Sequence, residues 1–216
     1  MHVELIAITR YLRGNGTPEE LLEHAGRVCY RSQSRGDPGA FLRARIREGH
    51  ESLIEHASAT FEISGISRAC SHQLVRHRLA SYSQESQRYV SMDDPKWVIP
   101  PAIAADPEAL RIWEEFTEEV RRAYRRLRDR GVRKEDARFV LPNGTATRII
   151  VTMNFRELLH VFRLRISPHA QWEIRQVAVR MLEAVHPYAP SVFGDLRAEL
   201  RGRHPEYFEG LAATTS

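Results

Sequence analysis

The chain has 216 residues, of which 42% are apolar and 28% charged, and its formal net charge at pH 7 is +4. This length is sufficient for one domain with a buried core, and the composition excludes a disordered or fibrous protein. No apolar run reaches the ~20 residues of a membrane-spanning helix, no secretion signal is visible, and the two cysteines, Cys29 and Cys70, are too few for a disulfide framework. We therefore expect a cytoplasmic protein without membrane association.

The first half of the chain predicts strands and helices in a mixed order. Thr17 and Glu20 form a capping-box pattern with Pro18 in the first turn, which is typical of a helix start. The polar stretch 81–88 predicts a loop. From alternation, helical spacing and caps we expect, in chain order, a strand, two helices, a short helix, a strand and a helix: His2–Thr9, Thr17–Tyr30, a second helix ending at Gly49, Ser52–Glu55, Ala57–Ser64 and Ser67–Arg76.

The second half contains the clearest helix, from Asp106 to Gly131. Its apolar stripe follows three-and-four spacing, and its acidic residues precede its basic ones, which indicates a solvated, ion-paired outer face. The stripe consists of Leu110, Trp113, Phe116, Val120, Tyr124 and Leu127. A strand, a helix capped by an asparagine and a last long helix follow: Thr147–Thr152, Asn154 to about Arg165, and Ser167-Pro168 to before Pro187.

This order predicts a single α+β domain over residues 1–216 rather than a regularly alternating α/β fold. Residues 201–216 carry no readable signal, and we expect them to form a mobile tail. Neither a G-x-G-x-x-G fingerprint nor a P-loop is present, so a nucleotide would have to be held in another way.

Chemistry concentrates between Gln73 and Tyr89, in the stretch QLVRHRLASYSQESQRY. Of the 32 basic residues only Lys96 and Lys134 are lysine, and most of the 30 arginines need no functional explanation. This stretch, however, places arginines beside hydroxyls and amides, a combination that suits an anion such as a nucleotide phosphate or a dinucleotide cofactor. The alternative is a solvated basic loop.

The same stretch resembles the flavin-dependent thymidylate synthase family. Arg76-His77-Arg78, seven residues and Ser86 match that family's RHR-x7-S signature. Three further segments resemble family blocks in the right order: His50-Glu51-Ser52-x-x-Glu55-His56, Ala137-Arg138-Phe139-Val140-Leu141-Pro142, and Asn154-Phe155-Arg156 with Leu164-Arg165 and the segment His169 to Arg175. Together they cover roughly residues 49–180.

The resemblance implies an enzyme that methylates dUMP reductively to dTMP. The carbon would come from methylenetetrahydrofolate and the hydride from FAD reduced by NADPH. It also implies a central, mainly antiparallel sheet flanked by helices, and a homotetramer whose active sites lie between subunits.

Site residues follow from the resemblance position by position. The implied FAD contacts are Ser52, Arg76, His77, Arg78, Gln84, Asn154, Phe155, Arg156 and His160, with His50 near the flavin and folate. The implied dUMP contacts are Gln73, Leu74, Val75 and Arg76 from one subunit, and Gln84, Glu85, Ser86, Gln87, Arg88, Arg138 and Arg165 from others.

Physical chemistry assigns roles to several of these residues. Arg165 matches the family's activating arginine, and a permanent cation at N3–C2=O of uracil favours the enolate-like form that reacts. Arg88, Arg138 and Ser86 suit the 5′-phosphate, and no acid–base partner stands beside Ser86 to make it a nucleophile. We expect His77 to be neutral because the arginines on either side disfavour its charged form.

Two positions depart from the family pattern. Glu85 stands where relatives carry an apolar residue, and its carboxylate would repel phosphate unless it points outward. His160 stands where an asparagine is common.

Two other classes of function were weighed. Cys70, His72 and His77, with His50 and His56 upstream, could suggest zinc, but no paired ligand motif is present, and we expect no metal. An arginine-rich nucleic-acid-binding module would need basic residues on one face with stacking aromatics, whereas these arginines are scattered, so we expect no nucleic-acid partner.

Overall fold

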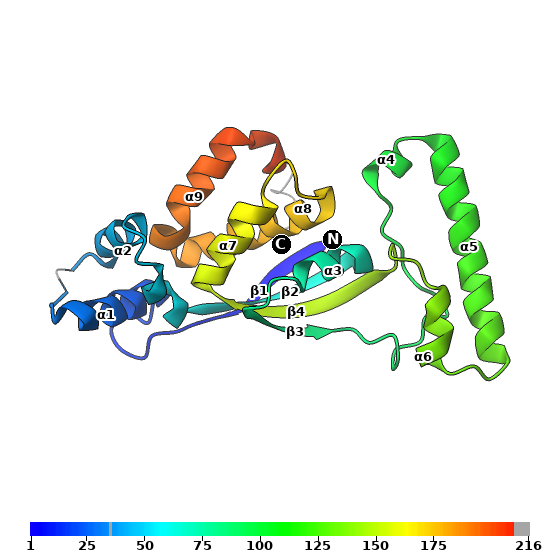
Figure 1. The fold of residues 1–216 in the computed structure, drawn as a ribbon, viewed down its shortest axis with the longest axis horizontal. Helices are drawn as coiled ribbons and strands as arrows, with labels where there is room; N and C mark the ends of the chain where they lie inside the picture. Colours follow the sequence, from blue (N-terminus) through cyan, green and yellow to red (C-terminus); the bar gives the residue numbers. More distant parts are fainter. Residues whose placement is uncertain (35, 210–216) are drawn as a thin grey trace.

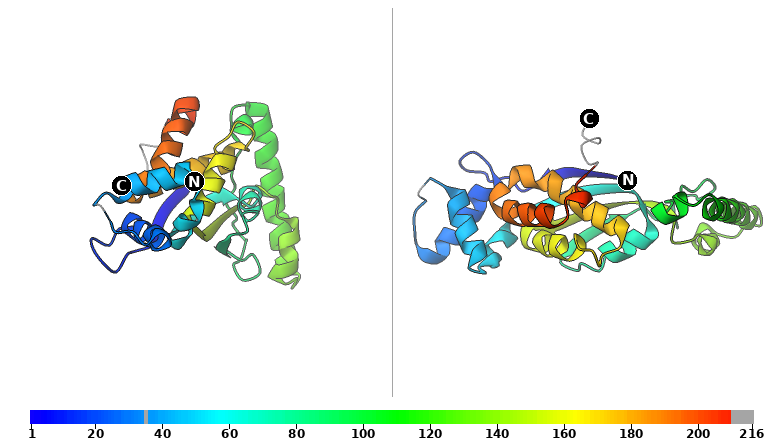
Figure 2. Two further views of the ribbon diagram at one scale, coloured as in Figure 1. Left: turned by 60° about the vertical axis from the view of Figure 1, so that its left-hand side comes forward. Right: turned by 90° about the horizontal axis from the view of Figure 1, so that it is seen from above.

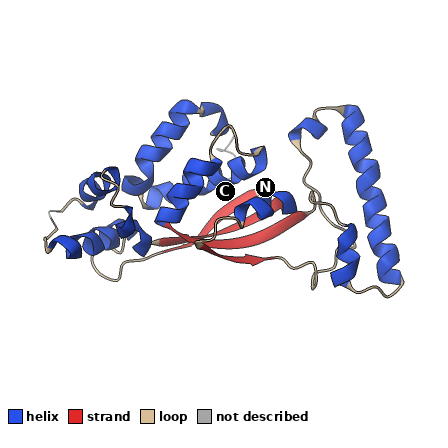
Figure 3. Ribbon diagram, viewed as in Figure 1, coloured by secondary structure: helices blue, strands red, loops and turns tan. Residues whose placement is uncertain are grey.

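The computed structural model describes residues 1–34 and 36–209, and within these ranges its strands form one antiparallel sheet (Figures 1 and 3). Its strand order is β1-β2-β4-β3. The strands are β1 His2–Ile8, β2 Ser58–Ser67, β4 Ala146–Asn154 and β3 Ala80–Gln84. The α+β class expected from the sequence is confirmed.

Alternation along β2 explains why the sheet buries one face. Phe61 and Ile63 are fully buried, whereas Thr60 and Glu62 lie on the opposite face, as the sequence predicted. On that opposite face the Thr60 hydroxyl lies 2.9 Å from the hydroxyl of Thr152 on β4. The hydrophobic core therefore lies on one side of the sheet.

Helices cover that side and both ends of the sheet. In Figure 1, α7, α8 and α9 lie above the strands, α1 and α2 lie at one end, and α5 stands apart at the other; both views in Figure 2 agree. The longer helices are α1 Pro18–Tyr30, α2 Pro38–Arg47, α3 Arg68–Leu74, α5 Pro107–Asp129, α7 Phe155–Arg165, α8 Trp172–Val185 and α9 Pro190–Arg203. The shorter ones are α4 Pro101–Ala104, α6 Lys134–Ala137 and the 3-10 turns η1 Glu51–His56, η2 Arg138–Val140, η3 His186–Tyr188 and η4 Pro205–Tyr207.

Side chains cap three helix starts, and the sequence predicted two of these caps, Thr17 and Asn154. The Thr17 hydroxyl accepts from the Glu20 backbone N–H, while the Glu20 carboxylate accepts from the Thr17 backbone N–H. Asp106 caps α5, and Asn154 caps α7 by accepting from the Glu157 N–H at 2.9 Å. These caps satisfy backbone donors that have no partner within the helix.

Several expectations about elements were wrong. The stretch predicted as a loop from Ser81 begins as strand β3, which pairs with β4 at the edge of the sheet. The last predicted helix begins at Trp172, because Gln171 rather than Ser167 supplies the cap. The expected short helix at Ser52 is a 3-10 turn without a side-chain cap.

The C-terminal region is more ordered than expected. Helix α9 continues through Arg203, and Phe208 is buried, with the guanidinium of Arg175 lying 4.3 Å from the centre of the Tyr207 ring. The part of the predicted mobile tail from 201 to 209 is thus packed against the domain, and residues 210–216 lie outside the described residues.

The apolar stripe of α5 is only partly covered. Val120 and Tyr124 are buried, and Tyr124 packs with Met92 and Ala137, but Phe116 remains 49% exposed. None of the helices within the described ranges is long and apolar enough to cross a membrane.

Candidate functional site

The turn between α3 and β3 carries the Arg-His-Arg motif. Arg76 and Arg78 are exposed, whereas His77 is only 4% exposed. The Tyr82 hydroxyl on β3 lies 2.8 Å from the carbonyl oxygens of both Leu74 and His77, and so ties the turn to the sheet. The backbone of the motif is thereby fixed while two guanidinium groups remain free to meet a ligand.

Arg165, at the last turn of α7, lies against this motif. Its Nε donates to Nε2 of His77 at 3.0 Å, and its Nη2 donates to the carbonyl of Gln73 at 3.3 Å. The resemblance assigned Gln73 and Arg165 to different subunits, but the structure places them side by side in one chain. We call Gln73, Arg76, His77, Arg78 and Arg165 the turn group.

The expected neutrality of His77 is supported, but its cause differs from the one predicted. The pKa of His77 is lowered to about 4, mainly by burial and in smaller part by the neighbouring charges of Arg165 and His160. The flanking Arg76 and Arg78 play no part in this pKa shift. The His160 ring meets the His77 ring nearly at right angles, with 5.7 Å between ring centres.

The start of α7 and turn η1 bring together most of the remaining predicted flavin contacts. Ser52 and His160 are exposed, and the half-exposed Arg156 pairs with Glu55 at 2.5 Å. Phe155 is an exception, because its ring is fully buried and packs edge-to-face on Phe193. Its main chain is buried as well, and its N–H donates to the carbonyl of Ala57 at 2.9 Å.

His50 lies in a short hydrogen-bonded chain. Its Nδ1 is 2.9 Å from the hydroxyl of Tyr30, which in turn accepts from Arg45 at 3.4 Å. The His50 ring is exposed and therefore accessible to a ligand, as the resemblance requires.

The residues following β3 meet a different part of the chain. The Gln84 amide donates to the hydroxyls of Ser71 and Thr147, so its nitrogen is already engaged. The Glu85 N–H donates to the carbonyl of Arg148 at 2.9 Å, so this backbone donor is held by the sheet and not by a ligand. Ser86 accepts only from the Arg88 N–H among its side-chain contacts within the described ranges, with no acid–base partner.

A cavity of about 260 Å³ opens beside these residues. Gln87 and Arg138 line it, as does Arg68, for which the sequence predicted no role. Arg68 donates to the carbonyl of Glu85 and Arg138 to the carbonyl of Glu135, so neither charge is neutralised by these contacts. Burial and the nearby Arg138 lower the pKa of Arg68. We call Arg68, Gln87, Arg88 and Arg138 the loop group.

Two further residues were missed by the sequence analysis. Glu157, 7% exposed on α7, lies 3.5 Å from Nδ1 of His77. Glu135 pairs with Arg88 at 3.4 Å. Each contact joins positions at least 47 residues apart, which no local pattern in the sequence could have revealed.

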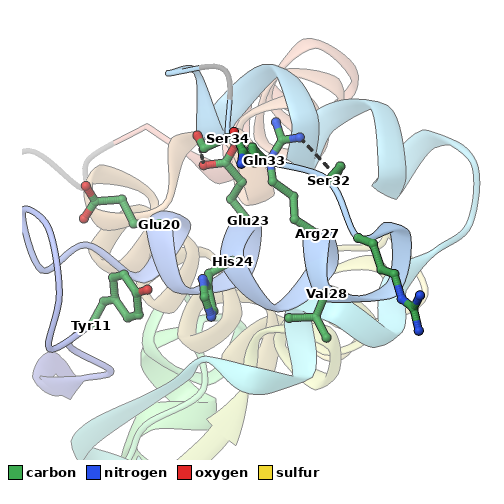
Figure 4. A pocket seen from close by; sticks show the side chains of 10 residues that line it. Tyr11, Glu20, Glu23, His24, Arg27, Val28, Ser32, Gln33 and Ser34 are labelled. Atoms are coloured by element: carbon green, nitrogen blue, oxygen red, sulfur yellow. Dashed lines mark hydrogen bonds and ion pairs between the residues drawn. The ribbon is translucent and has the colours of Figure 1, made fainter.

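A cavity of about 590 Å³ lies between α1 and the loop that follows it, and none of the predicted site residues lines it (Figure 4). Glu23 is the buried acid on its wall. This carboxylate is 2.7 Å from Arg27 and accepts from the Ser34 hydroxyl, so its charge is already compensated. We assign this hollow no role in the site.

The described residues contain no group of three or more histidine, cysteine or acidic side chains arranged to hold a metal ion. Cys70 is buried, and burial raises the pKa of its thiol. His77, the other internal member of the zinc alternative, is bonded to Arg165.

Comparison with known proteins decides the family. The family model described as "Thymidylate synthase complementing protein" matches residues 10–191. A flavin-dependent thymidylate synthase from Geobacter sulfurreducens is 50% identical over 189 residues, covering 82% of each chain. The chain belongs to the flavin-dependent thymidylate synthase family. A second member, from Mycobacteroides abscessus, is 42% identical over 224 residues, covering 90% of this chain and 89% of that one.

The fold agrees with this family. The crystal structure of thymidylate synthase X from Helicobacter pylori, determined with FAD and dUMP, superimposes with a TM-score of 0.76. The match covers 91% of this chain and 99% of that one at 22% sequence identity. The family-wide architecture is therefore retained at low sequence identity.

Proposed function

We propose that this chain is an FAD-dependent thymidylate synthase that converts dUMP to dTMP, with methylenetetrahydrofolate as carbon donor and NADPH as reductant. The observation that carries the proposal is the setting of Arg165. Its guanidinium is held by a neutral imidazole and a carbonyl, so its position is fixed while its positive charge remains uncompensated by these contacts. Such a charge is suited to act on a bound substrate.

The residues around the turn group fit a flavin dinucleotide. Its diphosphate is anionic, and Arg76 and Arg78 are exposed and form no ion pair within residues 1–34 and 36–209. The side chains that would hold FAD are Ser52, Arg76, Arg78, Asn154, Arg156 and His160. When bound, the reduced flavin supplies the hydride.

Arg165 acts on the pyrimidine through charge. An arginine remains protonated at any working pH, so it cannot remove a proton as a base. Placed at N3–C2=O, it stabilises the negative charge that develops there and makes C5 a better nucleophile towards the donor's methylene carbon.

The loop group supplies the phosphate site. Arg68 and Arg138 line one cavity, and burial together with repulsion from Arg138 lowers the pKa of Arg68. A dianionic 5′-phosphate would relieve that repulsion, with Arg88 and Ser86 as further contacts. Arg68 thus joins the residues assigned by resemblance.

We also propose a cytoplasmic homotetramer with active sites between subunits. The seven residues of α3 separate Arg68 from the Arg-His-Arg turn by about 10 Å, at a helical rise of ~1.5 Å per residue. The two groups thus occupy opposite ends of one short helix. The resemblance assigned Gln73 to Arg76 to one subunit and Gln84 to Arg88 with Arg138 to others, and a site shared in that way would combine the turn group of one subunit with the loop group of another.

Nucleic-acid binding is the weaker candidate. Three arginines of α5 are engaged by acids of the same helix: Arg111 with Glu108, Arg121 with Glu118, and Arg122 with Glu119. This pairing reduces the free charge that the helix offers to a phosphate backbone.

The proposed function is tested by reconstitution and turnover. The purified chain should bind FAD, become reduced by NADPH in the presence of dUMP, and form dTMP once methylenetetrahydrofolate is added. Arg165→Ala should retain FAD but lose turnover by about 100-fold or more, and Arg165→Lys should be nearly as poor because the planar fork is lost. Arg203→Ala is the matched control, since Arg203 pairs with Glu199 on the exposed side of α9. A chain that binds no FAD after reconstitution would refute the proposal.

A further inference from the structure

His77 is the buried member of an otherwise exposed motif. The residue is 4% exposed, and the polar side chains it meets are Arg165, Glu157 and His160. The resemblance assigned this residue to the flavin. We propose instead that His77 is a positioning residue, which holds the guanidinium of Arg165 in the orientation needed for the pyrimidine. This inference rests on the proposed function only for the identity of that substrate.

The hydrogen bond fixes the tautomer of His77. Because the guanidinium of Arg165 has only donors, Nε2 of His77 must present its lone pair to Nε–H of Arg165. A neutral imidazole then carries its proton on Nδ1, and this nitrogen faces Oε1 of Glu157 at 3.5 Å. Glu157 itself is fixed, since it stands in the capped first turn of α7. The side chains of Glu157, His77 and Arg165 therefore form a chain of contacts with a defined orientation.

The surroundings keep this arrangement in one protonation state. The charged and titratable groups facing the ring are Glu157, His160 and Arg165 from α7, while Tyr82 from β3 donates to the His77 carbonyl. Burial lowers the pKa of His77 to about 4, so the ring is neutral at physiological pH. Protonation would place an N–H against the Nε–H of Arg165 and break the contact.

The hydrogen bond to Arg165 and the burial of the ring exclude two other roles for the His77 side chain. The lone pair of Nε2 is already used by Arg165, so His77 cannot serve as a general base. The ring also has little exposed surface on which a flavin could stack. The remaining role of the His77 side chain is to orient Arg165. The Nε–H and one Nη2–H of Arg165 are engaged by His77 and Gln73, and its other three N–H groups are left for the substrate.

Two substitutions at His77 distinguish the effect of its hydrogen-bond acceptor from the effect of its side-chain volume. The side-chain oxygen of His77→Gln can take the place of Nε2 and accept from Arg165, whereas His77→Phe fills the space without an acceptor. We expect His77→Phe to lower kcat on the order of 100-fold and His77→Gln no more than about tenfold, with FAD content unchanged in both. His77→Phe combined with Arg165→Ala should be no slower than Arg165→Ala alone, because both changes remove the same contribution.

A spectroscopic readout of the His77 tautomer does not depend on activity. The holoenzyme labelled with ¹⁵N-histidine should show the proton of His77 on Nδ1 and a bare Nε2 at neutral pH, with the signal assigned by its loss in His77→Gln. A proton on Nε2 of His77 would overturn the inference. So would a fold-loss of kcat in the double variant that equals the product of the fold-losses in His77→Phe and Arg165→Ala. If the wild-type chain makes no dTMP while the Nδ1–H tautomer is present, the proposed function fails and the Glu157–His77–Arg165 arrangement still stands.

Discussion

Arginines in this protein differ by the kind of acceptor that holds them. Arg111 and Arg197 face carboxylates, Glu108 and Glu183, which cancel their charge. Arg68 and Arg165 face carbonyl oxygens or an imidazole, which orient the guanidinium but leave its charge available. Arg88 and Arg156, which are also assigned to ligands, pair with the carboxylates of Glu135 and Glu55. A neutral acceptor therefore marks an arginine whose charge is available, and not every arginine assigned to a ligand.

Arg68 provides the test of this distinction. Arg68→Ala should raise KM for dUMP about tenfold or more, because a charge-assisted contact to phosphate is lost, while FAD binding is unchanged. Steady-state kinetics with dUMP measures the effect. Arg122→Ala, at an arginine paired with Glu119 on α5, is the control and should behave like wild type. An unchanged KM in Arg68→Ala would place the phosphate elsewhere.

At the scale of elements, the buried end of α8 fixes the start of α3. The Glu173 carboxylate, 1% exposed, accepts from the Ser67 backbone N–H at 2.6 Å and from its hydroxyl at 2.5 Å. The Ser67 hydroxyl in turn accepts from the Cys70 N–H and caps α3. One acid therefore ties together the helix that carries the Arg-His-Arg turn and the helix that precedes the C-terminal segment.

Removing the Glu173 carboxylate should destabilise the fold. Glu173→Ala leaves the N–H and hydroxyl of Ser67 buried without an acceptor, which should reduce the free energy of unfolding by about 3 kcal/mol, at roughly 1–3 kcal/mol per unsatisfied group. Glu173→Gln retains one acceptor oxygen and should lose about half as much. Denaturant unfolding of both variants measures the difference. A loss below about 1 kcal/mol in Glu173→Ala would mean that Ser67 finds other partners.

The sequence predicted elements whose signals are local. Thr17 and Asn154 were identified as caps from neighbours three residues away, and β2 from its own alternation. Strand β3 was missed because its outward residues, Ser81 and Ser83, are polar and its stability comes from pairing with β4, far along the chain. Most of the candidate site residues were named from motifs, yet the contacts that distinguish their roles join distant segments.

At the scale of the whole molecule, the turn group and the loop group each contain part of what the proposed reaction needs. Arg165 belongs to the first group and Arg138 to the second. If the site is shared, neither group suffices within one isolated chain. The half-exposed Phe116 on α5 is consistent with additional burial in an assembly.

Mixed assemblies distinguish shared sites from sites within one chain. Arg165→Ala and Arg138→Ala should each be nearly inactive alone, because each removes one group from every site. Co-expressed with different tags and purified on both, they should regain activity, since some sites receive an intact Arg165 from one subunit and an intact Arg138 from another. Random mixing gives about a quarter of sites with both arginines, and therefore about a quarter of wild-type turnover. Activity no higher than that of the single variants would mean that both arginines act within the same subunit.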